Sequence, residues 1–116
     1  VFERRGASWT LEQTLLPAGG DPGDRFAHDV AVDQGTALVG APRDDTYAGP
    51  EAGGIAVFAR REGTWSQEHR VALERSGVGY HAWHVVAMGD RHAIAGVPGD
   101  VDVDGKRVGS AVVLRR

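Results

Sequence analysis

The sequence predicts an all-β fold built from repeated four-stranded antiparallel sheets, the blades of a β-propeller. Three observations lead to this prediction. The chain repeats itself at a period of 56 residues, each period holds short runs of strand-forming residues, and glycines separate these runs. No window combines an apolar period of about 3.6 residues with helix-capping residues. Helices are therefore not expected.

The repeat is visible when the sequence is shifted against itself by 56 positions. Without a gap, 18 of the 60 overlapping positions are identical. The matches include Trp9 with Trp65 and Gly40 with Gly96. Unrelated segments of this composition would match at about five positions. The chain is therefore an internal duplication.

Four strands are expected in one period. The first two form a hairpin closed by Asp33-Gln34-Gly35, a turn in which Gly35 adopts a positive φ. A Glu62-Gly63 turn joins the last two. The expected strands cover residues 26–32, 36–40, 54–60 and 64–73 in the first copy, and 85–88 and 92–95 in the second.

The length sets the domain organisation. A propeller closes with about 4–8 blades, whereas 116 residues hold about two periods of 56. We therefore expect an open arc of a larger propeller. Residues 1–16 are assigned to the last strands of a preceding blade, 17–73 to a complete blade, and 74–116 to the first three strands of the next. Further blades of the same chain are the expected partners, and the isolated segment should self-associate through its apolar faces.

Composition excludes several classes of protein. Thirteen Lys and Arg stand against 16 Asp and Glu, a net charge of −3, so no nucleic-acid partner is expected. No apolar run approaches the ~20 residues of a membrane span, so this segment is not expected to insert into a membrane. The chain has no Cys, which excludes disulfides, thiol catalysis and Cys-ligated zinc.

The first copy carries a recognisable run. Phe26-Ala27 is followed by Val30-Ala31-Val32 and then by Gly40-Ala41-Pro42. This run resembles the bacterial FG-GAP repeat, which is related to the propeller blades of integrin α-subunits. In the second copy Ala82-Trp83 and Gly96-Val97-Pro98 stand at the same positions. The resemblance implies a propeller blade, an extracellular or cell-surface location, and ligand contact through loops on one face.

The residues of this motif have structural explanations. Each glycine should end a buried strand where a Cβ would fill needed space, and each proline should stop the ladder. The aromatic residues should supply apolar area between blades. The expected structural residues are Trp9, Phe26, Gly40, Pro42, Trp65, Gly96 and Pro98.

One acidic run invites a metal interpretation. Asp100, Asp102 and Asp104, followed by Gly105, match the opening of a calcium loop. The twelfth position is Ala111, where an EF-hand loop needs a bidentate Glu. Two interpretations stay open at this point: a Ca²⁺ site, or a solvated acidic loop without a cofactor.

No catalytic residues are predicted. His28 and His84 hold the same position in the two copies, which favours a structural role over a unique active site. The pair His28-Asp29 has no Ser or Cys in a nucleophile motif beside it.

The longest loops, residues 43–52 and 99–108, follow the second strand of each copy. Loops on a rigid scaffold commonly carry binding residues. We therefore expect a non-catalytic structural or interaction module that binds a protein or a glycan. The alternative is a propeller domain of a larger carbohydrate-active or other hydrolytic enzyme, with catalytic residues elsewhere. The candidate binding residues are Asp44, Asp45, Tyr47, Asp100 and Asp102.

Overall fold

The predicted all-β class is confirmed. The computed structural model describes residues 1–47, 49–72 and 82–115, which form nine strands and no helix. Within these ranges, accordingly, no helix is present that could cross a membrane. The strands are β1 (Phe2–Arg5), β2 (Ser8–Leu11), β3 (Asp29–Asp33), β4 (Thr36–Ala41), β5 (Gly54–Arg61), β6 (Thr64–Val71), β7 (Val85–Met88), β8 (His92–Val97) and β9 (Ser110–Arg115).

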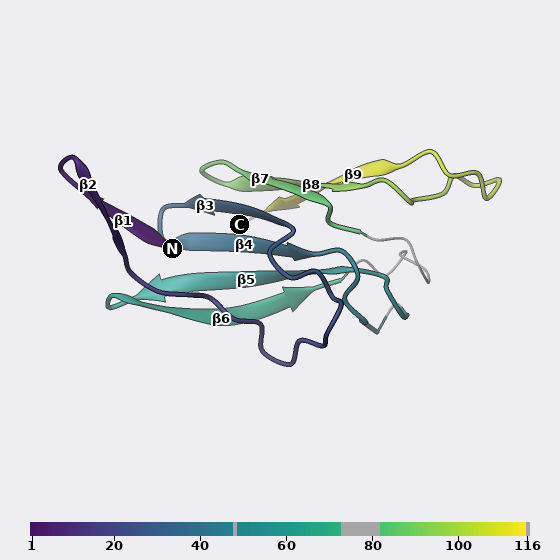
Figure 1. Ribbon diagram of the computed structural model, residues 1–116. Coiled ribbons are helices and arrows are strands. Elements are labelled where there is room, and N and C mark those ends of the chain that lie inside the picture. The colour runs from purple at the N-terminus through teal and green to yellow at the C-terminus, as the bar shows by residue number, and fades with distance from the viewer. Residues whose placement is uncertain (48, 73–81, 116) are drawn as a thin grey trace.

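The strands form three antiparallel sheets, ordered β1-β2, β3-β4-β5-β6 and β7-β8-β9 (Figure 1). We call the four-stranded sheet unit 1 and the three-stranded sheet unit 2. Val30 lies opposite Val39 in unit 1, and Val86 lies opposite Ala95 in unit 2, so the register repeats 56 residues later. The sequence duplication is therefore a structural duplication. The arrangement fits propeller blades, although the described sheets do not close into a ring.

The predicted hairpin turns are present. Gln34 and Gly35 have φ values of 41° and 76° between β3 and β4, and Glu62 and Gly63 have values of 51° and 82° between β5 and β6. Two successive positive φ values match the right-handed twist of the flanking strands. Both turns therefore keep consecutive strands paired.

The first strand of unit 1 begins later than predicted, whereas β7 has the predicted bounds, Val85–Met88. The strand expected over 26–32 begins only at Asp29, because Ala27 has a φ of 65° and cannot continue the ladder. Trp83 has a φ of 72° at the same point before β7. The strand expected over 64–73 ends at Val71, and residue 73 lies outside the described ranges.

Side chains alternate between the two faces of unit 1. Leu38 and Ile55 point to one face, which we call downstream because unit 2 covers it. Ala37, Val39 and Phe58 point to the opposite, upstream face. Unit 1 therefore contributes to two separate hydrophobic cores.

The larger core lies between the units. Leu38 and Ile55 pack with Trp83, Val86 and Ala95 of unit 2, and Trp83 has no exposed surface. Figure 1 shows β7 running along β3 and β4, in agreement with the contacts between these strands. Neither unit could bury this face alone, which is the physical basis of repeat architectures.

The smaller core is covered by the N-terminal segment. Val1, Leu15 and Phe26 pack against the upstream face of unit 1. They leave Val30 and Val32 of β3 exposed on the same face. The upstream face is therefore only partly covered within the chain.

Candidate functional site

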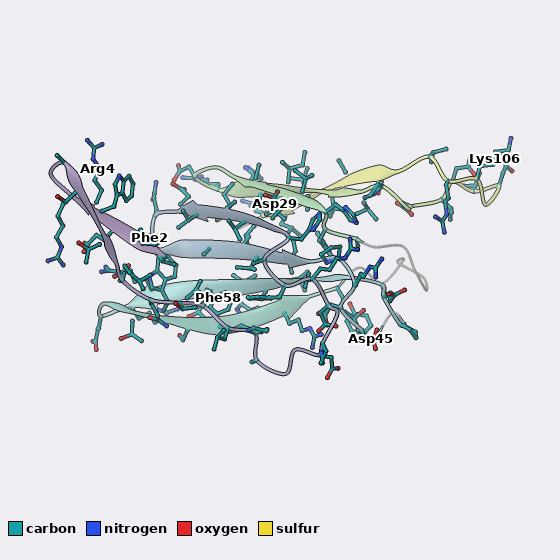
Figure 2. The ribbon with its side chains drawn as sticks, viewed as in Figure 1. Phe2, Arg4, Asp29, Asp45, Phe58 and Lys106 are labelled. Carbon is teal, nitrogen blue, oxygen red and sulfur yellow. The ribbon has the colours of Figure 1, made fainter. Side chains whose placement is uncertain are left out.

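The longest loop within unit 1 and the longest loop within unit 2 lie at the same end of the sheets. One connects β4 to β5 and the other connects β8 to β9. Figure 2 labels Asp45 and Lys106 in these loops, and both lie at the end opposite the β1–β2 hairpin with Phe2 and Arg4. This loop end holds all five predicted binding residues.

Asp44 lies inside the protein and not on the loop surface. Its carboxylate accepts a hydrogen bond from Arg70 Nε at 2.6 Å and forms an ion pair with the same guanidinium. Its carbonyl accepts from Gly53 N at 2.9 Å. A Cβ on Gly54 would lie 2.6 Å from its Oδ2, so glycine is needed there. Asp44 therefore ties the β4–β5 loop to β6.

Tyr47 and Asp45 form the exposed part of the same loop. Tyr47 is 75% exposed, yet its hydroxyl donates to the Ala72 carbonyl at 3.0 Å. Asp45 Oδ1 accepts from Glu51 N at 2.8 Å, and the Asp45 carbonyl accepts from Arg70 Nη2 at 3.1 Å. These residues line a hollow of about 330 Å³. We call Asp45, Thr46, Tyr47, Arg70 and Ala72 the loop hollow.

The acidic run of the β8–β9 loop is hydrogen-bonded to its own backbone. Asp102 Oδ1 accepts from Asp104 N and from Lys106 N, both at 2.9 Å, and Asp100 Oδ1 accepts from Val101 N at 2.9 Å. Among the described residues, no group of three His, Cys, Asp or Glu side chains could hold a metal ion. The calcium interpretation of Asp100, Asp102 and Asp104 stays a prediction.

Gly40 lies where the two units meet. A Cβ on Gly40 would lie 2.5 Å from the Trp83 carbonyl oxygen, so the close approach of two backbones requires glycine. At Gly96, by contrast, a Cβ would meet nothing within 4 Å. Both glycines were predicted to stand where a Cβ would fill needed space, and the structure shows this at Gly40 but not at Gly96.

The other motif residues differ in burial. Pro42 and Trp65 are buried, and Phe26 is half-buried with its ring centroid 6.3 Å from that of Phe58. Pro98 is exposed. Trp9 is 65% exposed, so it buries little of the area expected of it.

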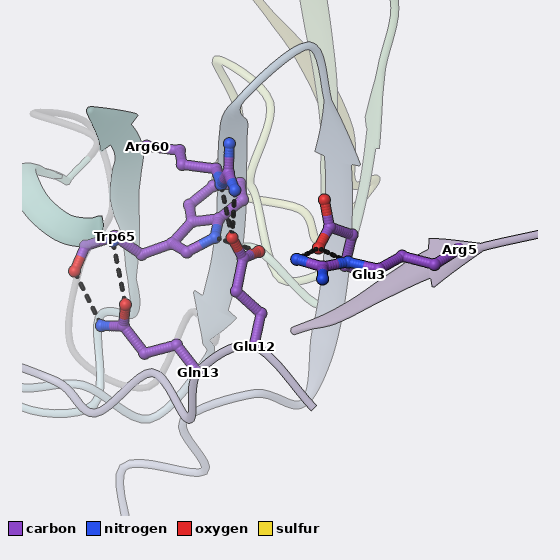
Figure 3. Close-up of polar contacts among 6 residues, drawn as sticks. All are labelled: Glu3, Arg5, Glu12, Gln13, Arg60 and Trp65. Atoms are coloured by element: carbon purple, nitrogen blue, oxygen red, sulfur yellow. Dashed lines mark hydrogen bonds and ion pairs between the residues drawn. The ribbon is translucent and has the colours of Figure 1, made fainter. Parts of the chain in front are cut away.

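The N-terminal segment is held by polar contacts that the sequence did not predict (Figure 3). Gln13 donates to the Trp65 carbonyl at 2.8 Å and accepts from Trp65 N at 2.9 Å. Glu12 accepts from Trp65 Nε1 at 3.0 Å and from Arg60 Nε at 2.6 Å. The hydrogen bond from Trp65, followed by that from Arg60, lowers the pKa of Glu12 below 4.5. These contacts fasten the segment after β2 to unit 1.

The repeat also brings equivalent residues into contact. His28 and His84 lie with ring centroids 4.9 Å apart in an edge-to-face arrangement. Asp29 Oδ2 accepts from Val86 N at 2.7 Å across the same boundary. The sequence pattern favoured a structural role for the two His but predicted neither their contact nor that of Asp29.

Stacked antiparallel sheets repeated along one chain define a propeller-type module. Residues 9–58, from β2 to the middle of β5, match the family model of the FG-GAP repeat, so this segment is an FG-GAP repeat and the predicted family is confirmed. No curated protein is similar enough to the chain to count as a match.

Proposed function

We propose that the chain is a non-catalytic interaction module of an extracellular or cell-surface protein, and that the loop hollow contacts a protein ligand. The observation that carries the proposal is Tyr47, a largely exposed aromatic side chain held in one orientation by its bond to Ala72. An aromatic residue ordered before binding loses little conformational entropy on association.

The neighbours of Tyr47 support a protein ligand. The Arg70 guanidinium is fixed by Asp44 and by the Asp45 carbonyl. Tyr and Arg are the residue types most enriched among those that dominate the energetics of protein interfaces. A shallow hollow with one acidic and one basic group beside an aromatic ring suits a side chain of a partner protein.

The proposal is tested by retention of surface proteins. The wild-type chain, Tyr47→Ser and Leu16→Ser would be immobilised and probed with the surface protein fraction of the producing organism, and in parallel with a glycan array. Leu16 is as exposed as Tyr47 and lies outside the loop hollow, so it is the matched control.

We expect a protein that is retained by the wild type and by Leu16→Ser and is depleted about tenfold with Tyr47→Ser. Equal retention by all three chains would contradict the proposal. Binding confined to the glycan array would assign the loop hollow to a carbohydrate instead.

A further inference from the structure

Two histidines, one from each copy of the repeat, lie in contact at the boundary between the units. His28 and His84 have ring centroids 4.9 Å apart and ring planes inclined by 66°. His28 is exposed and His84 is half-buried, so solvent reaches the pair. Each stands directly before the first strand of its unit. The pair lies at the loop end, because Asp29 at the start of β3 is opposite Gly40 near the end of β4.

The backbone around the pair has the same conformation in both units. Ala27 and Trp83, which precede the two histidines, have positive φ values of 65° and 72°. The chain therefore turns in the same way before each imidazole group. Directly after the first histidine, Asp29 Oδ2 accepts a hydrogen bond from Val86 N at 2.7 Å across the boundary. The separation of the two rings is thus set by backbone contacts as well as by their own packing.

The separation of the rings suits a shared transition-metal ion. Imidazole nitrogen is a good ligand for Zn²⁺, Ni²⁺ and Cu²⁺. Two Zn–N bonds of about 2.0–2.1 Å at a tetrahedral angle place the ring centroids about 5 Å apart, close to the 4.9 Å between His28 and His84. Each imidazole needs one nitrogen for the ion and keeps the other for a hydrogen bond. Rotation of the rings, without a shift of the backbone, can then direct one nitrogen of each toward the ion.

We propose that His28 and His84 together bind one divalent transition-metal ion, such as Zn²⁺, across the boundary between unit 1 and unit 2. Among residues 1–47, 49–72 and 82–115, no third His, Cys, Asp or Glu joins them in a metal-binding group, so water completes the coordination. The ion links two units that share the larger core. Its binding therefore stabilises the contact between them.

This site differs in chemistry from the acidic run of the β8–β9 loop. Nitrogen ligands select transition metals, whereas carboxylate oxygens suit Ca²⁺. Ca²⁺ should therefore not compete with Zn²⁺ for the histidine pair, and Asp102→Ala should leave Zn²⁺ binding unchanged.

The first test is calorimetric titration of the 116-residue chain with Zn²⁺ and, separately, with Ni²⁺. We expect one ion per wild-type chain. His28→Ala and His84→Ala should each weaken binding about tenfold or more, because the ion then keeps one of its two histidine ligands. His92→Ala is the matched control. His92 is an exposed histidine at the start of β8, whereas the residue after His84 pairs near the end of that strand.

The double variant with both His28→Ala and His84→Ala separates one shared ion from two independent histidines. With a shared ion, the double variant should lose little more affinity than either single variant, since each single substitution already breaks the chelate. Independent histidines would give two ions per wild-type chain, and each single variant would keep one ion at unchanged affinity. That result would overturn the proposal.

The second test is thermal melting with and without Zn²⁺. Zn²⁺ should raise the melting temperature of the wild type and of His92→Ala but not of His28→Ala or His84→Ala, because an ion that binds only the folded protein stabilises it. A chelator should reverse the rise. Circular dichroism without metal shows whether the variants fold, and His28→Gln and His84→Gln, which keep the size and polarity of the side chains, replace any alanine variant that does not.

A wild-type chain that binds neither ion overturns the proposal. Equal affinity of the wild type and His28→Ala overturns it as well, as does a loss in His92→Ala as large as that in the pair variants. One ion for every two chains, with a doubled mass in light scattering, would show an ion held between copies and would also count against it.

Discussion

The contact between Gly40 and Trp83 shows how one residue sets the spacing of two sheets. The Trp83 carbonyl occupies the place of a Cβ on Gly40, at 2.5 Å. Trp83 itself is fully buried and has a φ of 72°, so its backbone has little freedom to move aside. The separation of β4 from the start of unit 2 is therefore fixed by the absence of one methyl group.

We predict that Gly40→Ala lowers the free energy of unfolding by about 2 kcal/mol, because the added methyl group forces the units apart. Gly96→Ala is the control, because a Cβ there meets nothing within 4 Å. Urea denaturation of both variants, at concentrations where the chain is monomeric, measures the difference. Equal stability of the two variants would show that the close approach is not energetically important.

Glu12 links the N-terminal segment to unit 1 through its charge. Its pKa is lowered by the hydrogen bond from Trp65 and then by that from Arg60, so the folded state favours the carboxylate. A lowered folded pKa contributes stability that is present above the unfolded value of 4.5 and is lost as the pH falls through the folded value.

We predict that the wild type is more stable than Glu12→Gln at pH 7 and that this difference shrinks as the pH falls below 4.5. Chemical denaturation at several pH values measures it. Glu62→Gln serves as a control, because Glu62 lies exposed in the β5–β6 turn. A wild-type advantage that does not change with pH would contradict the assigned role of the Glu12 carboxylate.

At the scale of the elements, the strands were predicted from the 56-residue repeat and from the turn residues. The consecutive apolar residues Ala37, Leu38 and Val39 indicate β4, and the Asp33-Gln34-Gly35 turn sets its register with β3. The predicted start of β3 was wrong because Ala27 has a positive φ, which its residue type does not indicate.

The loop end was predictable in location but not in detail. Loop length indicated where Asp45 and Tyr47 lie, and the structure brings both into one hollow. The inward position of Asp44 depends on Arg70, which lies 26 residues away in the chain. The contact between Asp44 and Arg70 depends on the pairing of β5 with β6. The sequence pattern predicts this strand pairing but not which side chains it brings together.

The β8–β9 loop is organised by Asp102. Its carboxylate accepts hydrogen bonds from two backbone N–H groups of the same loop. We predict that Asp102→Ala increases the amide hydrogen exchange of Asp104 and Lys106 without calcium, because their acceptor is lost. Asp104→Ala is the control, since its carboxylate takes no part in these bonds.

Unchanged exchange in Asp102→Ala would contradict this role. Calorimetric titration of the same variants with Ca²⁺ tests the calcium prediction separately. Heat released by the wild type and absent in both variants would establish a site, and no heat from the wild type would remove it.

At the scale of the whole molecule, stability depends on neighbouring units. The described residues have a radius of gyration of 14.9 Å, whereas a compact domain of this length would have about 13 Å. The β1–β2 hairpin and the β8–β9 loop project at opposite ends of the stacked sheets (Figure 1), and the larger core lies between units 1 and 2. Repeat proteins of this kind derive much of their stability from the interfaces between units.

Native-state amide hydrogen exchange tests most directly whether the two units form one core. Leu38 of β4 and Ala95 of β8 both lie in that core. We predict that the amides of β4 and β8 share one opening free energy and that Leu38→Ala lowers it in both strands. If β8 instead opened at a much lower free energy than β4 and did not respond to Leu38→Ala, the units would be independent and the account would be contradicted.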